Sequence, residues 1–400
     1  MINLELPKDL QDLTGLMRQF SEGGLRPISR KYDTLEQKEL PEELVELGAL
    51  LKAGRSSSSK KEGASKSESN RNGNNMRMTV ATEAMCWGDV GLFLAMPTIG
   101  LGNAAVEAVA SDEQKAEWGE LFAAMAITEP GCGSDSANIK TTATLDGDEW
   151  VLNGEKIFVT DGYRCRQVVV WASLDTTMGK AAIKSFFVPK GTPGMTVTRV
   201  EHKLGIRASD TAQIVFENCR VPKANLLGNP EIAKTAEARK KAFGGVMQTF
   251  DNTRPIVAAQ AVGLARAALD LTLDLLKEQG LTLDYSKNYH QLSAIESDLY
   301  GLEADWESAR LLVLKAAWMA DNRQPNSMNA SMSKAKAGRM GNEVSLKCVE
   351  ICGQLGYSQT ELLEKFARDS KIIDIYEGTQ QIQQLIIARQ ILGKNSSELK

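Results

Sequence analysis

Histidine is nearly absent from this sequence, which has only His202 and His290 among 400 residues. A zinc site of the HExxH type needs two histidines four residues apart, so this class is excluded and no metal site is expected. A Ser-His-Asp triad would have to use one of these two side chains, and neither lies near a GxSxG nucleophile elbow. The scarcity of histidine therefore favours chemistry that a bound organic cofactor performs.

The sequence also lacks any C-x-x-C pair, although it contains six cysteines. Zinc ribbons and thioredoxin-like redox motifs are not indicated, and reduced thiols in the cytoplasm are the simplest interpretation. Residues 1–10 contain three charged side chains and no apolar run of signal-peptide length. No stretch of roughly 18 apolar residues is apparent, so no membrane span is expected.

Positive charge does not dominate, because 47 Lys and Arg stand against 51 Asp and Glu and the formal net charge is -4. Without a basic stripe, nucleic-acid binding is not expected as the main function. The length and the 42% hydrophobic content suffice for a sizeable core and predict two or three domains.

Helical periodicity marks residues 1–122, which we expect to form an N-terminal helical domain. Within it, residues 54–76 are rich in Ser, Lys and Asn and contain no apolar cluster, so a mobile loop is expected there. Residues 100–105, Gly-Leu-Gly-Asn-Ala-Ala, match the GxGxxA form of the dinucleotide fingerprint, but the segment before them reads as helix. A turn between two helices is the favoured interpretation, and a nucleotide site is the alternative.

The hydrophobic period changes near Ala124 to that of strands, and residues 123–225 predict a middle β domain. Asn153-Gly154 has the signature of a type I′ hairpin turn between strands at 149–152 and 156–160. Short strands without helices long enough for crossovers favour an antiparallel barrel or sandwich. Further strands are expected at residues 167–172, 183–188, 195–200 and 212–217.

Residues 226–400 are helical again, and their apolar positions form the seams of a C-terminal helical bundle. One seam advances in alternating steps of three and four over four heptads. Its members are Leu292, Ile295, Leu299, Leu302, Trp306, Ala309, Val313, Ala316 and Ala320. The expected fold is thus mainly α with a central β domain.

A carboxylate stands between apolar residues and a helix start in Ile375-Tyr376-Glu377-Gly378-Thr379. Thr379 is a suitable N-cap for the helix that follows, and Gly378 permits a tight turn directly after Glu377. The residues alone leave two interpretations of Glu377 open. It is either a structural carboxylate paired with a nearby Arg or Lys, or a general base in a partly dry pocket.

A second polar motif, Thr128-Glu129-Pro130-Gly131-Cys132-Gly133-Ser134-Asp135, opens the β domain. The glycines on either side of Cys132 can expose backbone N–H groups beside hydroxyls, which suits an anionic or carbonyl-rich ligand. A turn held by its own hydrogen bonds would have the same composition and is the alternative.

Together with Leu204-Gly205-Ile206-Arg207-Ala208-Ser209-Asp210-Thr211, these motifs have the order and spacing of the acyl-CoA dehydrogenase family, which the chain resembles over nearly its whole length. Further matches are Val221-Pro222, Asp251-Asn252-Thr253-Arg254-Pro255 and Arg368-Asp369. The resemblance implies an N-terminal helical domain, a middle β domain and a C-terminal four-helix bundle. It also implies dehydrogenation of an acyl-CoA thioester to a trans-2-enoyl-CoA, with FAD as cofactor and an electron-transferring flavoprotein as acceptor.

The resemblance makes Glu377 the catalytic base that removes the α-proton, while its backbone N–H stabilises the thioester oxygen. Positions that match cofactor contacts are Ile127, Thr128, Ser134, Phe158, Thr160, Thr379 and Gln381. Positions that match substrate contacts are Ser134, Phe250, Asp251, Arg254, Tyr376 and Gly378. Phe158 stands where the family usually has Trp. Core packing of Phe158 and an ion pair of Arg254 with a carboxylate are the alternatives from the residues alone.

The departures from the family pattern concern residues that homotetrameric members donate to a neighbour's FAD. An Arg and a Phe of a pattern like RxxFG are missing from residues 280–284, Gly-Leu-Thr-Leu-Asp, and Glu350 replaces a Gln. Gln354 also stands in place of a glycine. Because contacts to the chain's own FAD are kept, we expect a second family member as partner in an α2β2 assembly. A homotetramer is the alternative.

Two other functions are alternatives to a catalytic dehydrogenase subunit. An acyl-CoA oxidase generally carries a longer C-terminal extension and would consume oxygen during turnover. A non-catalytic scaffold subunit is expected to have lost Glu377, which this sequence contains.

Overall fold

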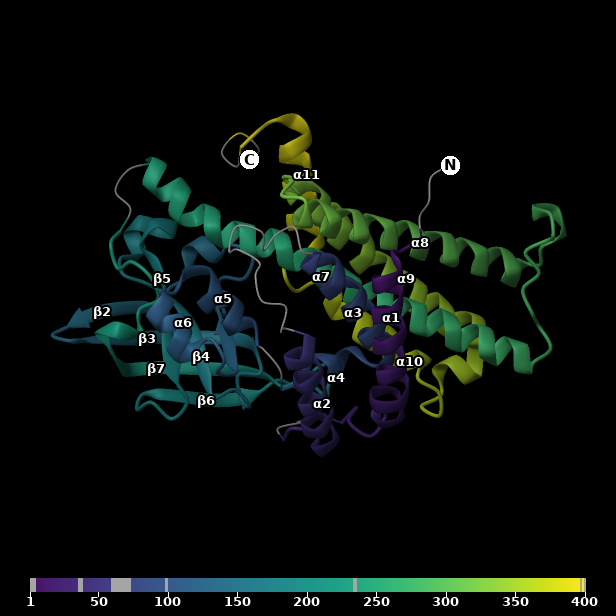
Figure 1. Cartoon of the computed structure of the whole chain (residues 1–400), viewed down its shortest axis with the longest axis horizontal. Coiled ribbons are helices and arrows are strands. Elements are labelled where there is room, and N and C mark those ends of the chain that lie inside the picture. Colours follow the sequence, from purple (N-terminus) through teal and green to yellow (C-terminus); the bar gives the residue numbers. More distant parts are fainter. Residues whose placement is uncertain are drawn as a thin grey trace.

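The computed structural model describes residues 5–34, 39–58, 73–97, 100–232, 236–395 and 398; the side chains of residues 52–58, 108 and 236–252 are not described. A sheet domain occupies one end of the molecule and a bundle of long helices the other (Figure 1). The N-terminal helices pack against the bundle. The order of helical, β and helical parts confirms the expected fold class.

The N-terminal part is built from short helices separated by caps and turns. Contrary to expectation, both ends of the segment 54–76 are helical, because helix formers such as Lys52 and Ala53 carry the second helix through Ser58. Residues 59–72 of that expected loop lie outside the described part of the chain. The helices are α1 (Lys8–Phe20), α2 (Glu42–Ser58), α3 (Asn74–Gly88), α4 (Val90–Leu94), α5 (Leu101–Val109) and α6 (Asp112–Trp118).

The glycines of residues 100–105 allow α5 to pack directly on the first strand, β1 (Ala123–Ala126). A Cβ added at Gly100 would lie 2.2 Å from the Ala123 carbonyl oxygen, and one at Gly102 would lie 2.4 Å from that of Ala124. Only a residue without a side chain fits against this backbone. Helix packing therefore accounts for both glycines. The predicted turn is wrong for residues 101–105, which form the start of α5, while Gly100 is its N-cap.

Seven strands form one curled sheet in the order β1-β4-β2-β3-β7-β6, with β5 paired to the other side of β4. The pairings are antiparallel except those of β4 with β1 and β2. Every residue of β4 is buried, because α5 and α6 cover the sheet face opposite its main core. The remaining strands are β2 (Thr142–Asp146), β3 (Glu149–Thr160), β4 (Gln167–Ser173), β5 (Ile183–Pro189), β6 (Met195–Val200) and β7 (Thr211–Pro222).

The expected hairpin turn at Asn153-Gly154 is wrong, because β3 runs without interruption through both residues. Gly154 has φ +149°, and a Cβ there would lie 2.5 Å from Thr141 Oγ1, so its glycine serves a close strand contact. Asn153 Oδ1 accepts a hydrogen bond from Asn218 N at 2.8 Å across a bulge. The turn between β2 and β3 is instead made at Gly147, with φ +62°.

The C-terminal helices α7 to α10 pack into the expected four-helix bundle, and α11 follows them. Alternating small and branched apolar residues of the predicted seam, such as Leu299, Ala309 and Val313, are buried. Residues 253–278 have the length and composition of a membrane span, contrary to expectation, but most of them are buried as a core helix is. The helices are α7 (Ala236–Glu278), α8 (Ala294–Asp321), α9 (Ser327–Tyr357), α10 (Leu363–Ile373) and α11 (Gln380–Leu392).

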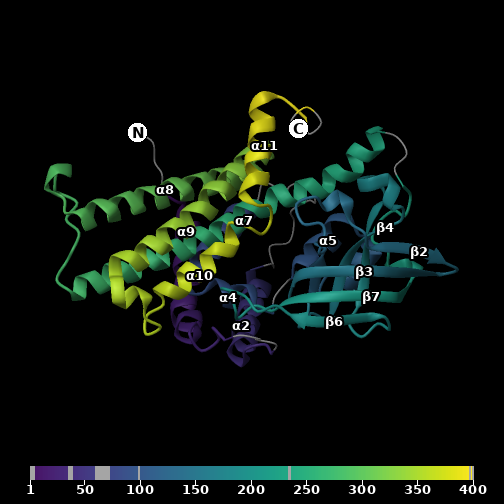
Figure 2. The same ribbon diagram turned by 180° about the vertical axis from the view of Figure 1, so that it is seen from behind.

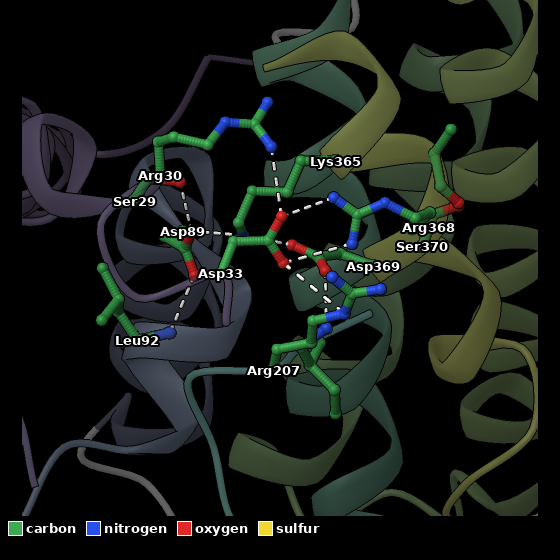
Figure 3. A network of polar contacts seen from close by, with 12 residues as sticks. Ser29, Arg30, Asp33, Asp89, Leu92, Arg207, Lys365, Arg368, Asp369 and Ser370 are labelled. Atoms are coloured by element: carbon green, nitrogen blue, oxygen red, sulfur yellow. Dashed lines mark hydrogen bonds and ion pairs between the residues drawn. The ribbon is translucent and has the colours of Figure 1, made fainter. Parts of the chain in front are cut away.

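A buried network of charges joins all three parts of the chain (Figure 3). Lys365 on α10 is 1% exposed, and its Nζ lies 2.6 Å from Asp89 and 2.6 Å from Asp369. Asp89 caps α4 through Leu92 N, and Asp369 accepts a hydrogen bond from the amide of Ile206 in the sheet domain. Although burial opposes its charge, the two carboxylates outweigh that effect and raise the pKa of Lys365.

An outer ring of ion pairs surrounds this network. Asp33 accepts from Arg368 Nη2 at 2.5 Å and pairs with Arg30 at 3.1 Å, so a single carboxylate links the N-terminal part to α10. A Cβ at Gly205 would lie 2.4 Å from the Arg368 carbonyl oxygen, which shows how closely the sheet domain approaches. The network therefore holds α10 in place directly before the turn that contains Glu377. The domain boundaries at residues 122 and 225 stay predictions.

Candidate active site

The turn from Asp374 to Thr379 connects α10 to α11, at the end of the bundle that faces the sheet (Figure 2). Thr379 is the N-cap of α11, as predicted, and its side chain accepts from Ile382 N. Glu377 has φ +55° and Gly378 has φ +98°, so two successive residues adopt left-handed backbone. That conformation is unfavourable for Glu and costs about 1–3 kcal/mol unless surrounding contacts impose it.

Two buried side chains supply those contacts. Gln383 Nε2 donates to the carbonyl oxygens of both Glu377 and Gly378 at 3.1 Å. Lys334 Nζ donates to the Gly378 oxygen at 2.8 Å. A Cβ at Gly378 would lie 2.4 Å from Gln383 Nε2, so glycine is required for this arrangement. We refer to Lys334 and Gln383 as the turn clamp.

One oxygen atom of the Glu377 carboxyl group is buried but accepts no hydrogen bond from the described residues. This atom is Oε2. Burial raises the pKa of Glu377, while the positive charges of Arg254 and Lys334 partly oppose this rise. A carboxylate that has a raised pKa and a buried oxygen atom without a hydrogen-bond partner is suited to accept a proton from a ligand.

The side chains that face Glu377 come from α7 and α9. Arg254 on α7 is 5% exposed and its charge faces Glu377, which agrees with its predicted place at the site. The Tyr376 hydroxyl hydrogen-bonds Gln260 on α7, and burial raises the pKa of this phenol well above its ordinary value. The side chains of Phe250 and Asp251, which the sequence also places here, lie outside the described part of the chain.

A second group of predicted residues lies on the sheet, where the segment after β1 crosses β3. Thr128 O accepts from Ile157 N at 2.9 Å, and Ile127 O accepts from Lys156 Nζ at 2.9 Å. Phe158 follows with φ +56°, and 60% of its side chain is exposed. An aromatic ring held outward by a strained backbone is not a core residue, so the packing alternative for Phe158 is wrong.

The glycine-rich turn is anchored by a buried ion pair that sequence reasoning did not identify. Lys156 Nζ lies 2.8 Å from Glu129 Oε1, and both side chains are at most 5% exposed. Burial favours the neutral acid, but hydrogen bonds from Lys156 and Thr141 outweigh it and lower the pKa of Glu129. This anchor leaves Ser134 exposed and the space beside Gly131 open. The turn can therefore present its backbone and hydroxyl groups to a ligand.

The structure thus places the predicted residues in two groups. Glu377, Gly378, Tyr376, Arg254 and Thr379 gather around the turn before α11, while Ile127, Thr128 and Phe158 meet on the sheet. Thr160 is half-buried in β3, and Ser134 and Gln381 are exposed at the surface.

Sequence reasoning missed both residues of the turn clamp. One signal for Lys334 was present, because it interrupts a stripe of small residues at helical spacing on α9, formed by Ala330, Ala337, Gly338 and Gly341. A lysine on a face that must be buried needs a specific partner. No comparable signal marks Gln383, because a glutamine is an ordinary residue in a helix with this sequence.

Comparison with known proteins gives a consistent result. Residues 124–219 match the acyl-CoA dehydrogenase middle domain, and residues 243–392 match the acyl-CoA dehydrogenase C-terminal domain. A mitochondrial short-chain specific acyl-CoA dehydrogenase of Rattus norvegicus is 38% identical over 70% of this chain and 67% of its own length. A short-chain specific acyl-CoA dehydrogenase of Clostridium acetobutylicum is 31% identical over 98% of this chain and 100% of its own length.

The three-dimensional comparison covers both groups of site residues. The structure of butyryl-CoA dehydrogenase from Megasphaera elsdenii superposes with a TM-score of 0.82 and 30% sequence identity. The superposition covers 98% of this chain and 100% of the other.

Proposed function

This chain belongs to the acyl-CoA dehydrogenase family, and on that premise we propose that it oxidises a short-chain acyl-CoA thioester to the trans-2-enoyl-CoA. The observation that carries the proposal is that Glu377 lies on a strained turn and that its Oε2 is buried without a hydrogen-bond partner among the described residues. In the reaction the α C–H bond breaks and its proton passes to Glu377 while the β-hydrogen leaves as hydride, so that a C=C bond forms. The short chain length is taken from the named relatives.

We propose FAD as the cofactor that accepts the hydride. The described residues fit a flavin, because Phe158 offers an exposed ring and the glycine turn offers an open backbone beside the Ser134 hydroxyl. Ile127, Thr128, Phe158 and Thr160 would hold the ring system, and Thr379 and Gln381 would contact the adenosine part. Bound FAD supplies an acceptor for two electrons, which we propose pass on to an electron-transferring flavoprotein. We also propose a cytoplasmic location, and the free cysteines among the described residues support a reducing compartment.

The proposal is tested on the flavin-loaded protein mixed with butyryl-CoA without oxygen. We expect the yellow flavin absorbance to bleach rapidly after mixing, and an enoyl-CoA product to form in an amount equal to the reduced flavin. Free CoA and a long-chain acyl-CoA serve as controls for binding without reaction and for chain length. A protein that no saturated acyl-CoA bleaches would not be a dehydrogenase. In a parallel reaction in air, oxygen consumption that matches product formation would identify an oxidase.

We further propose that the partner of this chain is a second, different family member. The loop after α7, which includes Gly280, lies at the end of the bundle far from the sheet, so it does not reach a cofactor held between this chain's own sheet and the turn with Glu377 (Figure 1). The side chain of Glu350, on α9, is 70% exposed and pairs with Lys347 at 2.7 Å. Trp318 on α8 and Tyr357 at the end of α9 are 50% and 82% exposed, which supports burial of these side chains in an assembly.

Expression with and without a partner subunit tests this assembly. Alone, the chain is expected to purify with well under one flavin per chain, because the cationic donor to the pyrophosphate is missing. Co-expression with the partner should raise the flavin content and give a complex that contains both chains. A stable, active homotetramer with one flavin per chain would contradict the proposal.

A further inference from the structure

Lys334 is a buried cation directed at the turn that contains Glu377. It lies on α9, is 1% exposed, and donates from Nζ to the Gly378 oxygen at 2.8 Å. A buried ammonium group is strongly unfavourable unless charges and hydrogen bonds compensate it. The lysine therefore points to a role for its charge at this position.

Gln383 provides an internal comparison, because it binds the same turn without a charge. Its Nε2 contacts the Glu377 and Gly378 oxygens at 3.1 Å each, and the residue is fully buried. The amide alone therefore already reaches both carbonyls of the left-handed pair. What Lys334 adds is a second bond to Gly378 and a positive charge beside Glu377.

The charges around these groups come from several helices. Facing Glu377 are Arg254 from α7 and Lys334 from α9, together with the Thr253 hydroxyl. Facing Lys334 are Asp374 and Glu377 from the turn, and Arg254. Burial lowers the pKa of Lys334 to about 8, although Asp374 and Glu377 act in the opposite direction. Lys334 is thus charged at neutral pH and loses its charge as the pH rises through about 8.

We propose that Lys334 is a positioning residue for Glu377, whose ammonium group holds the Gly378 carbonyl and places a positive charge beside the neighbouring carboxylate. This inference rests on the proposed role of Glu377 as the base. Because the base must be ionised to accept a proton, the acid limb of the pH–rate profile reports Glu377. The alkaline limb reports the loss of charge on Lys334.

The test compares pH profiles of flavin bleaching by butyryl-CoA in the wild type, Lys334→Met and Lys334→Arg. Methionine has a similar shape without the charge, and we expect its acid limb to move upward by about one pH unit, since an opposite charge nearby lowers the pKa of a carboxyl by about that much or more. Arginine keeps the charge at every accessible pH. In Lys334→Arg we expect the acid limb to stay near that of the wild type and the alkaline fall near pH 8 to disappear.

Two matched variants separate charge from shape. Lys336→Met removes the charge of a lysine two positions further on α9, which pairs with Asp305 at the surface, and should leave the profile unchanged. Gln383→Met loosens the turn without altering charge, so it should lower the rate while leaving the acid limb in place. A wild-type acid limb in Lys334→Met, or a wild-type alkaline fall in Lys334→Arg, would overturn the inference.

A measurement on flavin-free protein makes the inference independent of turnover. The infrared band of a protonated carboxyl that is present in the wild type and missing in Glu377→Gln reports the protonation of Glu377. We expect this band to persist to higher pH in Lys334→Met than in the wild type, and an unchanged band would also overturn the inference. If none of the acyl-CoA compounds bleaches the wild-type flavin but the infrared band still shifts in Lys334→Met, the proposed function fails and the charge coupling between Lys334 and Glu377 stands.

Discussion

Replacing Glu377 with Gln is expected to leave the flavin bound and to lower the rate of bleaching by butyryl-CoA by about 10³-fold, within the range that a general base contributes. Glutamine has nearly the same shape, so the turn and its clamp can form, but an amide cannot accept the α-proton. Stopped-flow absorbance with saturating substrate measures this rate. Turnover that persists at more than about a tenth of the wild-type rate would exclude Glu377 as the base.

The pH dependence of the wild type follows from the same group. Burial raises the pKa of Glu377, so the base becomes protonated at a higher pH than an ordinary Glu does, and the rate should fall as the pH is lowered through that pKa. Glu377→Gln should lack this acid limb in its residual rate. Glu343→Gln makes the same chemical change on the exposed face of α9 and is expected to keep both the rate and the profile.

Replacing Lys365 with Met is expected to destabilise the folded protein by about 3–5 kcal/mol, because it leaves Asp89 and Asp369 buried and facing each other without their cation. Breaking this network also frees α10 from the sheet domain, since Asp369 holds the Ile206 amide. The midpoints of thermal and urea unfolding measure the loss. Flavin content should fall with it, because α10 leads directly into the turn with Glu377.

A matched surface variant provides the control for this prediction. Lys336→Met also removes a lysine from an ion pair, but its partner Asp305 is half-exposed, so the expected loss is below about 1 kcal/mol. Adding Asp89→Asn to Lys365→Met should recover part of the stability by removing one of the two orphaned charges. A Lys365→Met protein that unfolds at the wild-type midpoint would show that the network contributes nothing to stability.

Local patterns predicted the elements whose structure depends on near neighbours. The strand expected at residues 195–200 coincides with β6, and Thr379 caps α11 as its position before an apolar helix indicates. The same kind of pattern failed at Asn153-Gly154. There the strand β7 and the approach of Thr141 decided the conformation, and neither is visible in a two-residue turn signature.

The order of helical and β parts and the motifs that identify Glu377 were predictable without a structure, because periodicity and spacing are properties of the chain alone. The sequence could not decide between a structural and a catalytic carboxylate without the family resemblance. Tertiary structure decided the left-handed conformation of Glu377 and Gly378. It also decided that Glu377 Oε2 is buried without a hydrogen-bond partner among the described residues. These depend on Lys334, which is 44 positions from Gly378 and meets it only because α9 packs beside the turn.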